Sequence, residues 1–295
     1  MKQSRKRVHM RKLIRALLCM LAFALVLTSS ATAETLSNSK AEIDVNTFSE
    51  GVIRVRSLMG KTKSCKVRIQ KDGFTYTYDL NRSGAWDVYP LQLGNGNYKI
   101  TVFEQVRGSS YAVAFFTNAS VKLTDPNAPF LHASKIVDYN EDSKAVIKAK
   151  EICKDLISDK DKVGAIYSYV IKNFKYDTKK ANAVINGTLT SYSPILDSVY
   201  EEKKGICFDY SALLAAMLRS VGVPCKTIMG YVSPKDLYHA WNEVYIKNEG
   251  WVTKIIYFDG KKWNLMDPTF GASKSEKSVL KFIGKSENYK KQYTY

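Results

Sequence analysis

The sequence has few of the residues that build metal sites. Its 295 residues include three histidines and five cysteines, and no two cysteines form a CxxC pair. Structural zinc sites need cysteines and histidines at short, regular spacings, so no zinc site is expected. Calcium sites need a loop rich in carboxylates, and the sequence has no such loop. We therefore expect neither a metal nor any other cofactor.

Long apolar runs are missing except near the N-terminus. There, seven basic residues precede the apolar residues 16–27, and the small residues 31–33 follow. This order is typical of a signal peptide, with cleavage after Ala33. Twelve apolar residues are too few for a stable membrane anchor, although a retained anchor is the alternative. We expect residues 1–33 to be removed and the mature chain to be secreted or held at the cell envelope, without stable membrane insertion.

Acidic residues are scarce relative to basic ones. The chain has 45 lysines and arginines against 28 aspartates and glutamates, a net charge of +17. Loss of the seven basic residues of the leader lowers this charge to about +10. The lysines are scattered instead of massed in one run, which favours a solvated surface or attraction to an anionic cell-wall polymer. No nucleic-acid partner is expected.

Four cysteines remain after export. Cys65 and Cys225 fall in strand-like runs, and Cys153 lies on an apolar helical face. Export would permit disulfides, but these positions favour buried free thiols.

The first half of the mature chain has the pattern of β-strands. Seven short segments alternate apolar and polar residues or are rich in β-branched and aromatic ones, and turn signals separate them. This pattern predicts a β-sandwich of immunoglobulin or fibronectin type III character over residues 34–127. Two prolines and no periodicity mark a boundary at 123–131. The predicted strands are residues 42–48, 51–58, 64–70, 74–80, 85–93, 98–106 and 111–123.

The second half, residues 128–295, is predicted to be an α+β domain. Apolar residues recur at helical spacing first and at strand spacing later. Lysine-rich residues from 276 onward include enough apolar side chains for a short docked segment. The predicted helices are residues 141–158, 161–174 and 194–204, and the predicted strands are residues 226–232, 237–247, 251–258 and 262–267.

The segment around Cys207 has the pattern of a nucleophile at a helix start. Gly205 precedes the cysteine, and Leu213 and Met217 mark an apolar face before Gly222 ends the helix. Unpaired N–H groups and the positive end of the helix dipole favour a thiolate at such a position. The alternative is that Cys207 is a small buried apolar residue.

A thiol nucleophile needs a base, and few histidines are available for that role. His132 lies in the predicted boundary segment and is expected to be a loop or packing residue. His239 lies mid-strand, on the predicted face that also carries Trp241, Glu243 and Tyr245. A rigid strand can aim an imidazole at a helix terminus. A structural histidine on a half-buried strand is the alternative.

A carboxylate could orient the imidazole of that histidine. Asp267 is the best candidate, because it ends a predicted strand and Pro268 follows it. If its strand lies beside that of His239, its carboxylate can accept the imidazole N–H. The rival carboxylates are Asp236, in a loop, and Glu243, four residues along the same strand.

Three sequence blocks together resemble a known family. They are GICFDYSALLAAMLRSVGVPCKTIMGY, YHAWNEVY and WNLMDPTF, with 32 residues from Cys207 to His239 and 28 from there to Asp267. This order is similar to the transglutaminase-like superfamily, a relative of the papain-like cysteine enzymes, over about residues 141–271. The resemblance implies Cys207 as nucleophile, His239 as base and Asp267 as its orienting partner. It also implies that an upstream aromatic residue, here Tyr176, helps to hold the oxyanion.

The resemblance implies acyl transfer through a thioester on the cysteine. The expected function is transglutaminase-like or protease-like chemistry on a protein or peptide at the envelope of a bacterial cell. The alternative is a catalytically silent binding module for an anionic cell-wall polymer or a surface protein. A purely structural pairing protein is a third possibility, suggested by the C-terminal Tyr289, Tyr293 and Tyr295.

Overall fold

The computed structural model describes residues 35–233, 237–252 and 288–295. Thr35 to Tyr295 form one compact unit that combines helices with antiparallel sheets. The predicted signal peptide, Asp236 and Asp267 lie outside the described residues. Among the described helices, none is both long and apolar enough to span a membrane.

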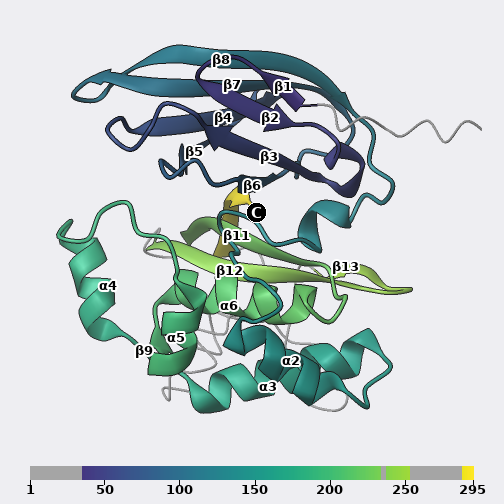
Figure 1. Ribbon diagram of the computed structural model, residues 1–295. Helices are drawn as coiled ribbons and strands as arrows, with labels where there is room; N and C mark the ends of the chain where they lie inside the picture. Colours follow the sequence, from purple (N-terminus) through teal and green to yellow (C-terminus); the bar gives the residue numbers. More distant parts are fainter. Residues whose placement is uncertain (1–34, 234–236, 253–287) are drawn as a thin grey trace, which may run out of the picture. The chain divides into compact units, whose positions relative to one another are not determined.

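Residues 35–121 form two four-stranded antiparallel sheets (Figure 1). The first has the order β1-β2-β3-β6, with β1 at Thr35–Ser37, β2 at Ala41–Asp44, β3 at Val52–Ser57 and β6 at Asp87–Pro90. The second has the order β5-β4-β7-β8, with β5 at Phe74–Leu80, β4 at Cys65–Lys71, β7 at Gly96–Arg107 and β8 at Ser110–Val121. All seven predicted strands are confirmed, and β1 is an additional strand that the sequence pattern did not indicate.

Strand alternation explains why these sheets form. On β4, Cys65, Val67 and Ile69 are buried, whereas the residues between them are partly exposed. Side chains from both sheets, such as Ile43 and Ile100, meet in one hydrophobic cluster. Each sheet therefore buries one face, as the period-two pattern predicted. Cys65 is a buried free thiol, as expected.

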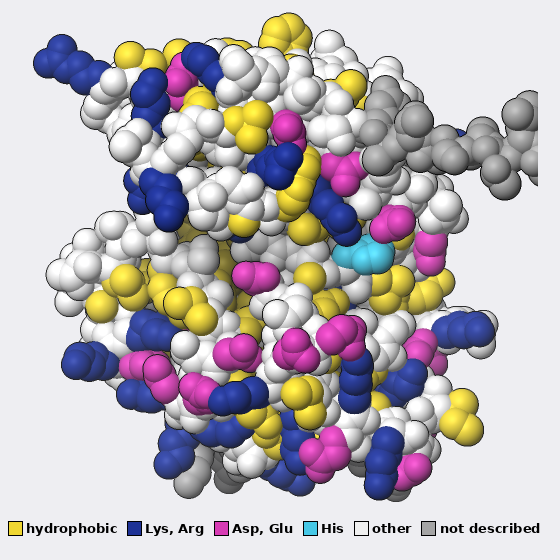
Figure 2. Space-filling view, viewed as in Figure 1, with side chains coloured by type: hydrophobic (Ala, Val, Ile, Leu, Met, Phe, Trp, Pro, Cys, Tyr) yellow, Lys and Arg dark blue, Asp and Glu magenta, His cyan; other side chains and the backbone are white. Residues whose placement is uncertain are grey.

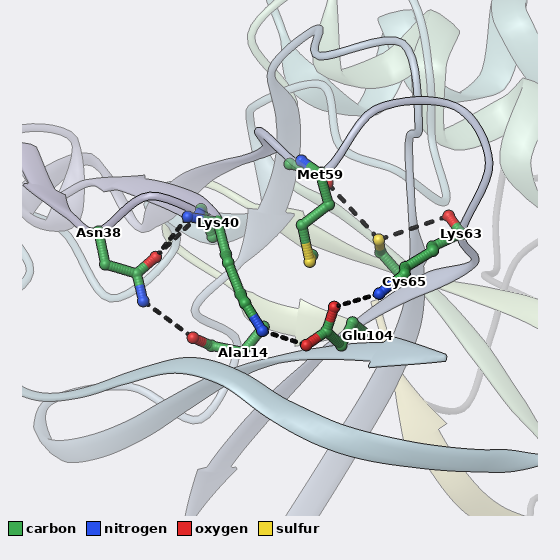
Figure 3. A network of polar contacts seen from close by, with 9 residues as sticks. Asn38, Lys40, Met59, Lys63, Cys65, Glu104 and Ala114 are labelled. Atoms are coloured by element: carbon green, nitrogen blue, oxygen red, sulfur yellow. Dashed lines mark hydrogen bonds and ion pairs between the residues drawn. The ribbon is translucent and has the colours of Figure 1, made fainter. Parts of the chain in front are cut away.

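A polar network links the edge of the first sheet to the second (Figure 3). The carboxylate of Glu104 on β7 forms ion pairs with Lys40, next to β2, and with Lys63, at 3.1 Å. The Asn38 amide donates to the Ala114 carbonyl of β8 at 2.9 Å. Hydrogen bonds from the two lysines lower the pKa of the Glu104 carboxyl group. The network therefore favours the ionised carboxylate.

Helices dominate the first part of the second half. They are α2 at Lys144–Cys153, α3 at Asp159–Asn173, α4 at Thr178–Ile185, α5 at Leu196–Glu202 and α6 at Cys207–Arg219, with short 3-10 turns η1 at Phe48–Glu50 and η2 at Ala128–Phe130 earlier in the chain. Buried side chains of α2, α3, α5 and α6 form one apolar cluster. The face of α6 that was predicted to be buried is buried, with Leu213 and Met217 fully enclosed. Cys153 is a buried free thiol, as expected.

The helix predicted over residues 141–158 is shorter in the structure, because the chain turns at both of its ends. Before α2, the Asn140 N–H donates to Ser143 Oγ at 3.1 Å, closing a turn. After α2, the Leu156 N–H bonds back to the Cys153 carbonyl at 3.0 Å. The sequence pattern did not indicate α4, which has no buried residue to create an apolar period.

In the described residues of the second half, a third sheet has four strands in the order β13-β12-β11-β14. Its strands are antiparallel neighbours: β11 at Cys225–Val232, β12 at Leu237–Ile246, β13 at Gly250–Val252 and β14 at Tyr289–Thr294. Figure 1 shows α6 alongside β11 and β12, with α2, α3 and α5 on its other side. The predicted docked segment at the C-terminus includes β14, which pairs with β11. Cys225 is a buried free thiol, as expected.

Candidate active site

Cys207 is the first residue of α6 and is half-buried. The first helical hydrogen bond of α6 runs from the Tyr210 N–H to the Ile206 carbonyl at 3.0 Å. The N–H groups of residues 207–209 have no backbone acceptor within the helix, as at every helix start. The thiol therefore lies where partial positive charge gathers, as the sequence predicted.

A short parallel ladder positions the chain just before Cys207. β9, at Lys175–Tyr176, pairs with β10, at Lys204–Gly205, so that Tyr176 is opposite Gly205. The Asp177 N–H also donates to the Gly205 carbonyl at 2.8 Å. Tyr176 is 37% exposed, and Gly205 is buried. Tyr176 is the predicted oxyanion donor. Its partner in this ladder, Gly205, lies only two residues before Cys207.

Gly205 is required because a carboxylate occupies the space where its side chain would be. A Cβ atom at this position would lie 2.6 Å from Asp209 Cβ and 3.0 Å from Asp209 Oδ2. Asp209 Oδ2 in turn accepts from the Ile206 N–H at 2.8 Å. This is one half of a capping box, since the apolar Ile206 cannot supply the other half. The turn that holds Cys207 is thus tied to the first turn of α6.

His239 lies near the start of β12 and is 4% exposed. Alternation along β12 places it on the same face as Trp241 and Glu243, as predicted. The opposite face packs on α6: Asn242 Nδ2 donates to the Ser211 carbonyl at 2.9 Å.

Further contacts show that α6 and β12 run in the same direction. Ser211 Oγ donates to the Trp241 carbonyl at 2.9 Å. Two turns later on α6, Arg219 Nε donates to the Cys225 carbonyl, also at 2.9 Å. Cys225 is the register partner of Val244, three residues after Trp241 on β12. The start of α6 therefore lies toward the start of β12.

This direction brings Cys207 and His239 to the same end of the contact between α6 and β12. The pKa of Tyr238, next to His239, is raised mainly by burial and also by Tyr293, Tyr231 and Cys207. The Cys207 thiol is therefore within electrostatic reach of the start of β12. A direct contact between the thiol and the imidazole stays a prediction.

The rival carboxylate Glu243 is already paired. It is 1% exposed, and it forms ion pairs with Lys291 and, at 4.0 Å, with Lys226. A carboxylate neutralised in this way is a poor partner for an imidazole at the other end of the strand. Asp267 keeps its predicted role, which the described residues do not test. In the part of the chain that the structure describes, no group of three His, Cys, Asp or Glu side chains could hold a metal ion.

Three residues at the site were not predicted from the sequence. Asp209 is buried behind Cys207, and Lys180 and Tyr192 both donate to its carboxylate. An aspartate three residues after a helix N-cap is a capping signal, so Asp209 could have been recognised. Lys180 and Tyr192 have no local signal, because they meet Asp209 only in the folded chain.

The family model of the transglutaminase-like superfamily matches residues 148–254. These residues form a transglutaminase-like core domain. The transglutaminase-like domain contains both Cys207 and His239, and Asp267 lies beyond the matched residues. The match supports a cysteine enzyme in the broad sense.

Two curated proteins are similar to part of the chain. The uncharacterized protein YebA of Bacillus subtilis (strain 168) is 32% identical over 110 residues, which cover 32% of this chain and 14% of that protein. The uncharacterized protein ML0607 of Mycobacterium leprae (strain TN) is 29% identical over 101 residues, 34% of each chain. A solved structure of a TGase aligns with 24% identity and a TM-score of 0.31, covering 45% of this chain and 31% of that one. The chain thus spans about a third or less of the length of these curated relatives.

Proposed function

We propose that the chain is an exported cysteine-dependent acyltransferase or amidase that acts through a thioester on Cys207. The observation that carries the proposal is the placement of Cys207 at the half-buried start of α6, within the transglutaminase-like domain. A nucleophilic thiolate must be partly accessible to substrate and must lie near positive charge, and the start of α6 offers both.

The reaction begins when the Cys207 thiolate attacks the carbonyl carbon of an amide and forms a C–S bond. The C–N bond then breaks, and the imidazolium of His239 gives its proton to the leaving amine. The thioester that remains is attacked by water or by a primary amine, which loses a proton to His239. This step releases the acid or the new amide and restores the thiolate.

Other groups are assigned supporting roles in this proposal. Asp267 accepts from the imidazole and fixes its tautomer. The Cys207 N–H, at the open end of α6, is one donor to the oxyanion. The Tyr176 hydroxyl is proposed as the second donor, which its register with Gly205 supports.

A protein or peptide is the proposed substrate, at the envelope of a bacterial cell. The half-exposed Tyr231 and Tyr238 lie on the neighbouring strands β11 and β12, with ring centroids 5.3 Å apart, and the charge of Cys207 acts on Tyr238. An apolar, aromatic rim of this kind suits an extended peptide better than a small charged molecule. Export is proposed from the basic and apolar residues at the N-terminus.

We also propose that residues 34–127 are a sandwich domain of immunoglobulin or fibronectin type III character within this compact unit. Tyr98, near the start of β7, supports this proposal, because its hydroxyl donates to the Leu91 carbonyl at 3.1 Å and the Gly94 carbonyl at 2.8 Å. Such a tyrosine corner is typical of these sandwiches.

The proposed chemistry is tested by acylation of the intact protein with a glutamine-containing peptide, followed by mass spectrometry. Wild type is expected to form a thioester adduct at Cys207, and Cys207→Ala is expected to form none. The matched control is Cys153→Ala, because burial raises the pKa of the Cys153 thiol and keeps it unreactive. Retained turnover in Cys207→Ala would disprove the proposal.

A second experiment tests the role of His239. Alkylation of Cys207 by iodoacetamide is measured against pH in wild type and in His239→Ala. We expect wild type to react below about pH 7, well under an ordinary thiol pKa, and the variant to lose this reactivity. Equal profiles in the two proteins would remove His239 from the mechanism.

A second candidate function is binding of an anionic cell-wall polymer, favoured by the outer face of β4, β7 and β8. This face carries three cations over aromatic rings: Lys66 over Tyr111 at 5.4 Å, Arg68 over Phe103 at 4.8 Å and Lys99 over Phe116 at 5.7 Å. Phe116 is 56% exposed. Aromatic rings beside cations can stack on sugar rings and attract phosphate or carboxylate groups.

The binding hypothesis is tested with purified wall teichoic acid and the full chain at low and high salt. We expect binding that weakens with salt and is reduced in the double variant Lys66→Gln, Lys99→Gln. The control is Lys150→Gln, Lys154→Gln, which changes the net charge equally in the second half of the chain. Lys150 pairs with Glu141 and Lys154 with Asp155, so this control should bind like wild type. Figure 2 shows basic and acidic side chains interspersed over the lower part of the visible face. Equal loss of binding in both double variants would mean that net charge alone explains the binding.

A further inference from the structure

Asp209 is a buried carboxylate beside the proposed nucleophile. It is the third residue of α6, two after Cys207, and its side chain is 0% exposed. Three donors reach it: the Ile206 N–H at 2.8 Å, Lys180 Nζ at 3.1 Å and the Tyr192 hydroxyl. We call Asp209, Lys180 and Tyr192 the Asp209 cluster.

The cluster attaches a whole segment to the start of α6. Lys180 lies in the first turn of α4, and Tyr192 lies in the loop after that helix. No residue from 178 to 193 is buried, so apolar packing does little to hold this segment in place. Lys180 Nζ also lies 3.0 Å from the Tyr192 hydroxyl and 4.9 Å from its ring centroid. The charged and polar contacts of the cluster therefore hold α4 beside Cys207.

The charges of the cluster lie within one helical turn of the proposed nucleophile. A second anion close to a thiolate disfavours the thiolate, and burial strengthens this repulsion. The ion pair with Lys180 offsets the charge of Asp209. The carboxylate can thus cap the Ile206 N–H without repelling a negative charge on Cys207.

We propose that Lys180 is a positioning residue for Cys207: it neutralises Asp209, so that one buried carboxylate can order the start of α6 while the thiolate next to it still forms. This inference rests on the proposed function, since it concerns the reactivity of Cys207. It adds to that function a residue from a helix that the sequence pattern did not indicate.

Several other titratable groups lie on elements next to the start of α6 and could also affect Cys207. From the neighbouring described elements these are Tyr176 and Asp177 beside β10, Lys204 paired with Asp177, Tyr231 on β11, and Tyr238 and His239 on β12. Burial, with the hydrogen bond and the charge of Asp209, raises the pKa of Tyr192, which therefore stays a neutral donor. None of these groups is changed in the variants compared at Lys180, so a difference between those variants reports on Lys180.

The test is the pH profile of Cys207 alkylation by iodoacetamide, with the modified peptide quantified by mass spectrometry. In Lys180→Met we expect the midpoint to move up by about one pH unit, the size typical of one uncompensated neighbouring charge. Lys180→Arg keeps the charge and should restore a midpoint close to that of wild type. Lys179→Met, at the exposed neighbouring position on α4, is the matched control and should behave like wild type.

The outcomes separate this inference from the proposed function. If wild-type Cys207 is inert below about pH 8, the proposed function fails, and this inference fails with it. If wild type is reactive and Lys180→Met has the same midpoint, the inference alone is wrong, even where the variant has lost thermal stability. Should Lys180→Met not fold, Lys180→Gln removes the positive charge while keeping a side-chain N–H that can still donate to Asp209. An upward shift in that variant supports the inference, and an unchanged midpoint overturns it.

Discussion

At the scale of single residues, Arg219 connects distant parts of the chain through backbone groups. It is 3% exposed, and it donates to the carbonyls of Cys225 at 2.9 Å, His132 at 2.8 Å and Tyr295 at 3.0 Å. One side chain on α6 thereby satisfies acceptors on β11, on the segment after η2 and at the end of β14. His132, predicted to be a loop or packing residue, takes part through its carbonyl group.

Arg219→Met is expected to lower the free energy of unfolding by about 3 kcal/mol, because it leaves buried carbonyl groups without donors. Urea unfolding followed by fluorescence measures the change. Arg54→Met, on the exposed side of β3, is the control and should change stability by less than about 0.5 kcal/mol. A loss below 1 kcal/mol for Arg219→Met would mean that water replaces the guanidinium.

Gly205 gives a second prediction at this scale. Gly205→Ala places a methyl group 2.6 Å from Asp209 Cβ, so either the capping contact or the β9·β10 ladder must shift. We expect the free energy of unfolding to fall by at least about 1 kcal/mol. The rate of Cys207 alkylation should fall by a larger fraction than the stability does. The matched control is Gly164→Ala in α3, where an added Cβ meets nothing within 4 Å. That variant should gain about 0.5–1 kcal/mol from helix propensity. Unchanged alkylation in Gly205→Ala would contradict the tight fit.

At the scale of elements, α3 depends on its N-cap. Ser158 Oγ accepts from the Asp161 N–H at 3.1 Å and donates to the Asp161 carboxylate at 2.6 Å. Ser158→Ala should cost about 1 kcal/mol of unfolding free energy, whereas Ser158→Gly, a tolerable cap residue, should cost only a few tenths. Thermal unfolding of the two variants measures the difference. A loss near zero for Ser158→Ala would mean that the cap hydroxyl does not contribute.

Elements with strong local signals were predicted well. The strands of the first two sheets follow from alternation, and α6 begins at Cys207 as expected. Weak or short elements were missed. β9 and β10 have two residues each, and α4 has no buried face. Their formation depends on partners elsewhere in the chain, and each of them is too short to show a clear period by itself.

At the scale of the whole molecule, Glu104 makes stability depend on pH. Hydrogen bonds from Lys40 and Lys63 place its native pKa below the unfolded value of about 4.3. The unfolded chain then binds more protons than the native one in this region, so stability rises with pH. The contribution is fully present above the unfolded pKa and is lost as the pH falls through the native pKa.

Glu104→Gln tests this linkage. We expect the urea midpoint of the variant to be lower than that of wild type at pH 7, with the gap closing as the pH falls toward 3, because protonated Glu104 resembles glutamine. Asp125→Asn, at an exposed position after β8, is the control for the general effect of acid. A gap that stays constant with pH would show that lost packing, and not the charge, explains the effect.

The candidate site was partly predictable from the sequence. The helix start at Cys207 and the face of β12 that carries His239 follow from patterns a few residues long. The predicted pairing of Asp267 with His239 depends on how two strands are arranged and stays a prediction, because Asp267 lies outside the described residues. The pairing of Glu243 with Lys291, which removes a rival carboxylate, depends on β14 reaching β11.

The sequence by itself determined which residues face the cores and where the helix that starts at Cys207 begins. Burial patterns and helix starts depend on neighbours within a turn or a strand pair, so local order is enough to specify them. Only the tertiary structure decided what surrounds Cys207 and the first turn of α6. Lys180 and Tyr192 reach Asp209 from 29 and 17 residues away. A buried carboxylate requires compensation, but its sequence neighbours do not specify which distant residue provides it.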